Sequence, residues 1–88
     1  MNIITRKNVS EYIQNHIDNK DFSKALALVS SFKVSGWTVT KSRAINEYGI
    51  SKNAIENLNH VVVANPYYRK AGDMKLYLIA EVLNHLNQ

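Results

Sequence analysis

The sequence contains no cysteine, and proline and glycine are scarce. Its 88 residues include one proline and three glycines. Without cysteine the chain can form neither disulfide bonds nor thiolate metal sites, so apolar packing has to supply nearly all of its stability. No apolar run approaches the ~20 residues that cross a membrane, and the N-terminus lacks the apolar run of a signal peptide. We therefore expect a single domain over residues 1–88 without a membrane partner. The expected location is cytoplasmic, either associated with the nucleoid or in the cytoplasm of a host cell.

Clustered reactive side chains are lacking as well. The three histidines, His16, His60 and His85, lie in different predicted elements, and no pair of them has metal-ligand spacing. The glycines are isolated from one another, so there is no glycine-rich loop to hold a phosphate. The sequence predicts a protein that is not an enzyme and that has no metal or other cofactor. The formal net charge of +4 is spread along both halves of the chain, which suits a polyanionic partner without locating its binding surface.

Two amphipathic helices are predicted within residues 8–36. Apolar residues recur at spacings of three and four in two runs, which are Val9, Tyr12, Ile13 and Ile17, then Phe22, Ala25, Leu26, Val29 and Phe32. The first helix should run to about Asn19, and Gly36 should end the second. The short link at Lys20 makes the helices antiparallel. This helical hairpin either packs against the C-terminal half of the chain or forms a homodimer interface.

Residues 39–58 have the pattern of a helix, a short turn and a second helix. Thr40 and Ser51 are suited to capping the two helices, and Gly49 suits the left-handed backbone of the turn. The sequence Gly-Ile-Ser, with an apolar residue four positions after the serine, has the spacing of a helix-turn-helix. It is similar to the start of MerR-type and excisionase-type winged domains. Asn53 in the second helix is a candidate for reading an adenine in the major groove.

A β-hairpin, here called the wing, is predicted to follow. Val61, Val62 and Val63 form one apolar run, and Met74, Leu76 and Leu78 alternate with polar residues in the next. Between these runs, the tip carries two aromatic and two basic side chains, namely Tyr67, Tyr68, Arg69 and Lys70. Aromatic rings beside cations combine base stacking with phosphate binding. The alternation leaves two places for Tyr77, either the protein core or the outer face of the wing near Lys75.

The run NPYYRKAGDMKLYL resembles the C-terminal part of the DNA-binding domain of the xeroderma pigmentosum group A (XPA) repair protein family. TKSRAINEYGIS is similar to the helix that opens that subdomain, so the resemblance covers about residues 40–86. It implies a helix, a hairpin and a long closing helix, and it implies DNA-facing positions at Lys41, Tyr67, Tyr68, Lys70 and Lys75. The chain departs from the family in lacking the four-cysteine zinc subdomain. It also has Val63 and Ala64 in place of a basic pair, and Ala71 in place of an aromatic residue.

The sequence therefore predicts a mostly helical α+β protein. A helical hairpin (8–36) precedes a small winged helix-turn-helix (38–88) with a two-stranded wing and a closing helix, in which Ile79, Val82, Leu83 and Leu86 face inward. The predicted function is non-enzymatic binding of duplex or junction DNA, as a small regulatory or recombination or repair accessory factor. The predicted nucleic-acid-binding residues are Lys41, Arg43, Lys52, Asn53, Tyr67, Tyr68, Arg69, Lys70 and Lys75. The alternative is a small phage or mobile-element protein that binds and inhibits a nucleic-acid-handling protein.

Overall fold

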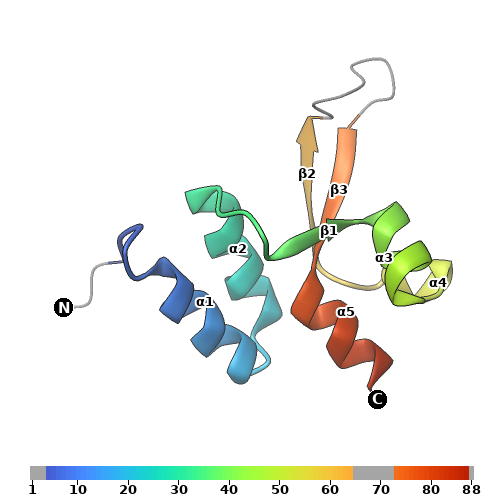
Figure 1. Ribbon diagram of the computed structural model, residues 1–88, viewed down its shortest axis with the longest axis horizontal. Helices are drawn as coiled ribbons and strands as arrows, with labels where there is room; N and C mark the ends of the chain where they lie inside the picture. Colours follow the sequence, from blue (N-terminus) through green and yellow to red (C-terminus); the bar gives the residue numbers. More distant parts are fainter. Residues whose placement is uncertain (1–3, 65–72, 88) are drawn as a thin grey trace.

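The computed structural model describes residues 4–64 and 73–87 of the chain. Within these two ranges, five helices and three strands follow one another in the order α1 (Val9–Asp18), α2 (Phe22–Phe32), β1 (Thr38–Thr40), α3 (Lys41–Tyr48), α4 (Lys52–Ile55), β2 (His60–Ala64), β3 (Asp73–Leu78) and α5 (Ile79–Leu86). Figure 1 shows the α1–α2 pair on one side of the sheet and α3 with α4 on the other. The mostly helical α+β class predicted from the sequence is confirmed. No helix in the described part of the chain is long and apolar enough to cross a membrane.

The N-terminal helices form the expected antiparallel hairpin, but α2 ends earlier than predicted. Its last helical residue is Phe32, and Lys33 adopts a left-handed backbone with φ of 52°. The N–H of Val34 then donates to the carbonyl oxygen of Val29 at 3.1 Å, which closes the helix end. The expectation that Gly36 ends the helix is therefore wrong. The helix ends three residues earlier because Lys33 adopts the left-handed conformation, which brings the N–H of Val34 to the carbonyl oxygen of Val29.

Replacing Lys33 by glycine should stabilise the protein. A side chain in the left-handed region costs about 1–2 kcal/mol. The extra chain entropy that glycine brings to the unfolded state offsets about 0.4–1 kcal/mol of this gain. We expect the free energy of unfolding of Lys33→Gly to rise by about 0.5–1 kcal/mol, measured by urea denaturation. Gly49→Ala is the mirror control, because Gly49 has φ of 80° and open space around an added Cβ. It should lose about 1 kcal/mol, and a loss in Lys33→Gly would contradict this account of the helix end.

The sheet has three antiparallel strands in the order β1-β3-β2. β2 and β3 are the two predicted strands, and β1 is an addition that the sequence did not reveal, being only three residues long. Val39, Tyr77 and His60 lie opposite one another across the three strands. Directly opposed residues share a face, so these three side chains and that of Lys75 lie on one face of the sheet. Leu76 and Leu78 lie on the other.

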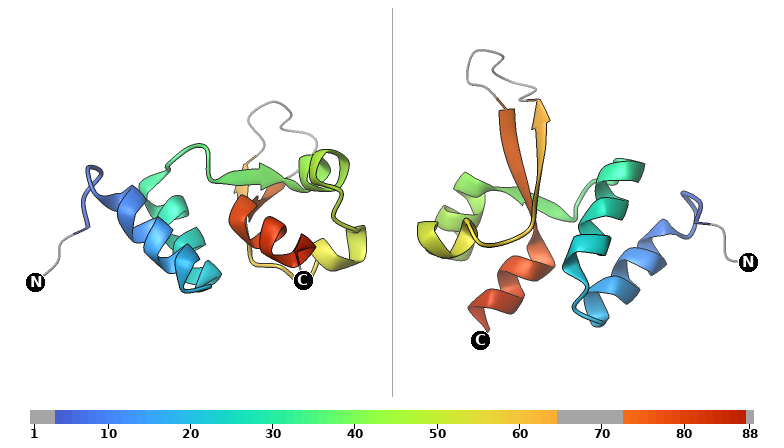
Figure 2. Two further views of the ribbon diagram at one scale, coloured as in Figure 1. Left: turned by 60° about the horizontal axis from the view of Figure 1, so that its bottom comes forward. Right: turned by 180° about the vertical axis from the view of Figure 1, so that it is seen from behind.

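Each face of the sheet is covered by its own apolar cluster. Leu78 belongs to the cluster made with α1 and α2, in which Ile13 and Ala25 are fully buried. Tyr77 belongs to the cluster made with α3, the turn after it, α4 and α5, in which Ile55 and Val82 are fully buried. The two further views in Figure 2 show the same division of the helices about the sheet. The neighbours Tyr77 and Leu78 therefore connect both clusters through one strand.

The closing helix α5 buries less of its apolar surface than the sequence suggested. Val82 is fully buried, and Ile79 packs against the same cluster. Leu83 and Leu86 were expected to face inward, but 42% of Leu83 and 39% of Leu86 are exposed. Ile79 and Val82 pack against one apolar cluster and Ala80 packs against the other, whereas Leu83 and Leu86 lie outside these contacts and remain at the surface.

Candidate nucleic-acid interface

The α3–turn–α4 unit is built by local signals that the sequence shows directly. The Thr40 hydroxyl accepts a hydrogen bond from the N–H of Arg43 at 3.2 Å, and the Ser51 hydroxyl accepts one from the N–H of Ala54 at 3.1 Å. Gly49 has the left-handed conformation predicted for the turn. Both caps and the turn are thus confirmed. α4 is a single turn, Lys52–Ile55, which limits how far it could enter a groove of DNA.

Two of the predicted DNA-facing cations are paired with carboxylates of the same unit. The Nζ of Lys41 lies 3.2 Å from Oε1 of Glu56, just after α4, and the Nε of Arg43 lies 2.7 Å from Oε2 of Glu47. The hydrogen bond that Arg43 donates to Glu47, followed by the negative charge of Glu47, raises the pKa of Arg43 above its usual value. Neither carboxylate was singled out from the sequence. Both ion pairs lie at the surface, so they reduce the local positive charge more than they stabilise the fold.

Lys52 and Asn53 open α4 and are both exposed. Within the described ranges, Lys52 makes no ion pair with a carboxylate. The carbonyl oxygen of Asn53 accepts a hydrogen bond from the Nδ2 of Asn57 at 3.2 Å, while the Asn53 side chain faces solvent. The structure therefore places both residues where a ligand could reach them.

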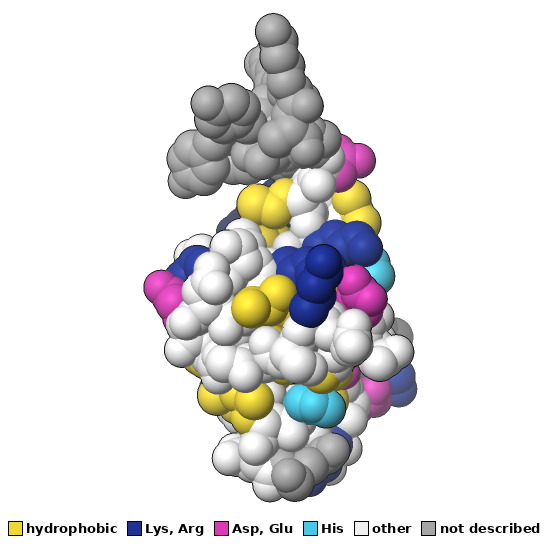
Figure 3. All heavy atoms as spheres, turned by 90° about the vertical axis from the view of Figure 1, so that its right-hand side faces the viewer, with side chains coloured by type: hydrophobic (Ala, Val, Ile, Leu, Met, Phe, Trp, Pro, Cys, Tyr) yellow, Lys and Arg dark blue, Asp and Glu magenta, His cyan; other side chains and the backbone are white. Residues whose placement is uncertain are grey.

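Lys75 lies on β3, opposite Val62 of β2, and its side chain is exposed. In the described part of the chain it has no ion-pair partner. His60 lies two residues before Val62 on the same face, with its ring centroid 5.7 Å from that of Tyr77. Tyr77 is only 1% exposed, so the core placement is the correct one of the two that the sequence left open. Figure 3 shows the side of the molecule on which α3 and α4 lie. Lys and Arg side chains gather near the centre of this face, with Asp and Glu side chains directly beside them.

The remaining predicted contacts are at the tip of the wing. They are Tyr67, Tyr68, Arg69 and Lys70, and all four lie outside the described residues. β2 ends at Ala64 and β3 begins at Asp73, so the strands that flank the tip are those predicted. The roles of the four tip residues stay predictions. Of the other five, the structure brings Lys41, Arg43, Lys52 and Asn53 together on one unit and sets Lys75 on the adjoining sheet.

Comparison with family models matches residues 38–82 to the family described as XPA protein C-terminus. The chain belongs to the XPA protein C-terminus family. This family is one of DNA-repair-related nucleic-acid-binding domains. Neither the comparison with curated proteins nor that with solved structures found a match. The XPA-family match begins at the first residue of β1 and ends inside α5, so it contains both caps, Lys75 and Tyr77, and it leaves the α1–α2 hairpin outside.

The XPA-family part of the chain is closed by a contact that the sequence did not indicate. Glu81 of α5 accepts hydrogen bonds from the backbone N–H of Asn59 at 3.2 Å and from its side-chain Nδ2 at 3.2 Å. Burial raises the pKa of Glu81 above its usual value, and the two Asn59 donors oppose that rise. The contact fixes the start of β2 against α5. The two residues are 22 positions apart, so no local spacing could have predicted it.

Two substitutions of Glu81 should separate its charge from its hydrogen bonds. Glu81→Gln keeps an acceptor oxygen for Asn59, so we expect its free energy of unfolding at pH 7 to equal or exceed that of the wild type. Glu81→Ala leaves the Asn59 donors without this partner and should lose about 1 kcal/mol. Because the folded state raises this pKa, it binds the proton more tightly than the unfolded state. This residue therefore adds stability as the pH falls through the raised value.

Chemical denaturation of the wild type and of Glu81→Gln at pH 7 and at pH 4, which is below the unfolded pKa of glutamate, measures this contribution. The gain in stability on acidification that Glu81 contributes should be absent from Glu81→Gln. If the variant and the wild type show the same difference between the two pH values, the burial of the Glu81 carboxylate has no energetic consequence.

Proposed function

We propose that this protein is a non-enzymatic module that binds duplex or junction DNA across the α3–α4 unit and the β2–β3 strands. The proposal rests mainly on the position of Lys75. Its side chain is exposed and has no ion-pair partner in the described part of the chain, and it lies on a strand within the residues that match a nucleic-acid-binding family. Phosphate contacts supply most of the affinity of such proteins. Lys75 is joined by Lys52, which is equally free in the described ranges.

The other proposed contacts rest on the sequence, since the tip of the wing lies outside the described residues. Arg69 and Lys70 neutralise further phosphates, and Tyr67 and Tyr68 stack on a sugar or on an exposed base. Lys41 and Arg43 contact the DNA backbone beside the first turn of α3. Their positive charge is partly neutralised there by Glu56 and Glu47. Asn53, exposed at the start of α4, reads a base edge. Such a protein would act in the cytoplasm or nucleoid as an accessory factor in regulation, recombination or repair.

The charge of Lys75 provides the test. Lys75→Gln should remove one phosphate contact. The negative slope of log K against log salt concentration should therefore become shallower by ~1, and binding to a duplex should weaken several-fold at low salt. Fluorescence anisotropy at two salt concentrations measures both. Lys7→Gln is the matched control, since Lys7 is exposed, carries the same charge and precedes α1. Equal effects of the two substitutions would mean that only net charge matters, and would remove the strands from the interface.

A second candidate function is favoured by the ion pairs. Lys41 and Arg43 are engaged by carboxylates of their own unit, which leaves the α3–α4 surface less positive than a DNA-binding surface usually is. A protein that occupies a nucleic-acid-handling partner needs no continuous positive face. Absence of DNA binding at low salt, together with a stable complex with such a partner, would select this candidate.

A further inference from the structure

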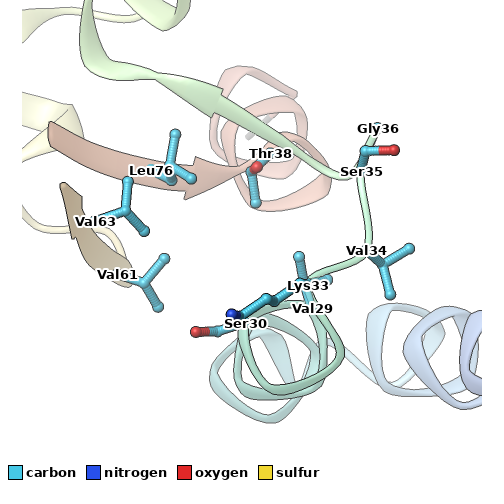
Figure 4. Close-up of a pocket in the computed structure, with 10 residues that line it drawn as sticks. All are labelled: Val29, Ser30, Lys33, Val34, Ser35, Gly36, Thr38, Val61, Val63 and Leu76. Atoms are coloured by element: carbon cyan, nitrogen blue, oxygen red, sulfur yellow. The ribbon is translucent and has the colours of Figure 1, made fainter. Parts of the chain in front are cut away.

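A groove of about 480 Å³ lies between the sheet and the C-terminal end of α2. Its lining residues are Val29, Ser30, Lys33, Val34, Ser35, Gly36, Thr38, Val61, Val63 and Leu76. Figure 4 shows Val61 and Val63 on β2 across the groove from the last turn of α2. It lies on the face of the sheet opposite Tyr77 and Lys75, so it is separate from the candidate nucleic-acid interface. One of its walls comes from residues 29–36, which the XPA-family match does not include.

The chemistry of the lining is mostly apolar. Val29 and Val34 contribute methyl groups from the α2 side, and Val61, Val63 and Leu76 contribute them from the sheet. Hydroxyl groups of Ser30, Ser35 and Thr38 are the neutral polar side-chain groups of the lining. A volume of this size with few polar groups is typical of a binding site. A nucleic acid is a poor occupant, because a single cation among apolar walls cannot neutralise successive phosphates.

β2 offers a backbone surface beside this groove. It is an edge strand whose only partner in the described sheet is β3. In the described part of the chain, no backbone hydrogen bond joins β2 to any other element. Alternate N–H and C=O groups of an edge strand point away from its partner and can pair with an added strand. A peptide that adds to such an edge gains affinity from main-chain hydrogen bonds and specificity from pockets that receive every second side chain.

Lys33 gives the groove its charge. It is the single charged residue of the lining, its side chain is exposed, and it has no ion-pair partner in the part of the chain that the structure describes. Its position is fixed, because the left-handed end of α2 holds it at the rim. An occupant that reaches this rim is therefore favoured when it carries a carboxylate there.

We propose that the groove binds an extended peptide segment of a partner protein, with apolar residues at alternate positions and a carboxylate that reaches Lys33. The segment pairs with the free edge of β2 and places its apolar side chains against Val61 and Val63 on one wall and Val29 and Val34 on the other. Binding on this face leaves Lys75 and the α3–α4 unit accessible, so the protein can hold nucleic acid and a protein partner together.

A defined peptide tests the proposal. The probe is fluorescein-labelled Val-Ser-Val-Thr-Val-Ser-Asp with an amidated C-terminus, in which the valines and the aspartate occupy alternate positions and so share one face of an extended strand. Binding is measured by anisotropy, and methyl NMR spectra locate the site. We expect saturable binding and shifts of the Val61, Val63 and Val34 methyl signals. Three altered probes should bind more weakly: one with its valines consecutive, one with lysine in place of aspartate, and one with alternate backbone amides methylated. Loss of the charge contact should weaken binding about fivefold.

Variants of the protein separate binding from folding. Lys33→Gly should bind the acidic probe about fivefold more weakly, although its stability is expected to rise, so unfolding cannot explain the loss. Val63→Glu should weaken binding at least tenfold by placing a charge in the groove. Val62→Glu is its matched control, because Val62 is the next residue of β2, is 55% exposed and lies on the opposite face. Its affinity should equal that of the wild type.

Three results would overturn the proposal. They are absence of saturable binding by the acidic probe at millimolar concentration, equal binding of the probe with consecutive valines, and a monomer–dimer equilibrium that Val63→Glu abolishes. The last result, measured by analytical ultracentrifugation, would assign the groove to a second copy of this chain.

Discussion

Replacing Glu47 and Glu56 together by glutamine is expected to tighten binding to duplex DNA by about tenfold at low salt. Each substitution removes the carboxylate that pairs with a predicted phosphate-binding cation. Lys41 loses its partner at 3.2 Å, and Arg43 loses its partner at 2.7 Å. Glutamine keeps the size of the side chain and removes its charge. The slope of log K against log salt concentration should steepen by ~2, because two cations become available to phosphates.

The fold should tolerate this change. Both ion pairs are at the surface, where such pairs contribute at most about 1 kcal/mol. Glu11→Gln is the matched control for charge, because Glu11 is exposed on α1, away from the α3–α4 unit. It raises the net charge without freeing a cation of the interface. If Glu11→Gln strengthens binding as much per charge as the double variant does, Lys41 and Arg43 do not contact DNA.

Tyr77→Ala and Leu78→Ala are each expected to bring the protein close to unfolding. Tyr77 is 1% exposed and Leu78 is fully buried, and they belong to the two different apolar clusters. Deletion of a buried aromatic or leucine side chain costs about 3–5 kcal/mol, because the cavity is only partly refilled. A chain of this length has about 4–13 kcal/mol of stability in total. Either substitution would therefore remove a large part of it.

Denaturation followed by circular dichroism and by the fluorescence of Trp37 measures these losses. Trp37 is the only tryptophan of the chain, and it packs against the cluster of Leu78. If residues 1–88 form the predicted single domain, the two signals should have one midpoint, and both substitutions should lower it. Val62→Ala is the control on the exposed strand surface and should change stability by less than about 1 kcal/mol. A Tyr77→Ala variant as stable as the wild type would contradict the two-cluster description.

The features that the sequence predicted correctly are local ones. The caps at Thr40 and Ser51 and the glycine of the turn act within three or four residues of themselves, so their effect can be read from spacing alone. The β2 and β3 strands were predictable from an apolar run and an alternating run. The family resemblance was carried by the same stretch, which lies within residues 38–82.

The features that were missed depend on contacts between distant parts of the chain. Lys41 and Glu56 are 15 positions apart, and the Asn59–Glu81 contact spans 22. β1 is too short to show an alternation in the sequence, and it forms because it pairs with β3. The Arg43–Glu47 pair is different, since its spacing of four on a helix is a local signal that could have been used. It would have shown that part of the predicted positive surface is neutralised within the protein.

In the proposed interface, nucleic acid binds on the sheet face of Lys75 and on the α3–α4 unit. An NMR titration of the isotope-labelled protein with a DNA duplex at low salt tests it most directly. We predict chemical-shift changes at Lys75, His60 and the first turns of α3 and α4, with α1 and α2 unaffected. Changes confined to the α1–α2 hairpin, or saturation with no change in the XPA-family part, would contradict the account.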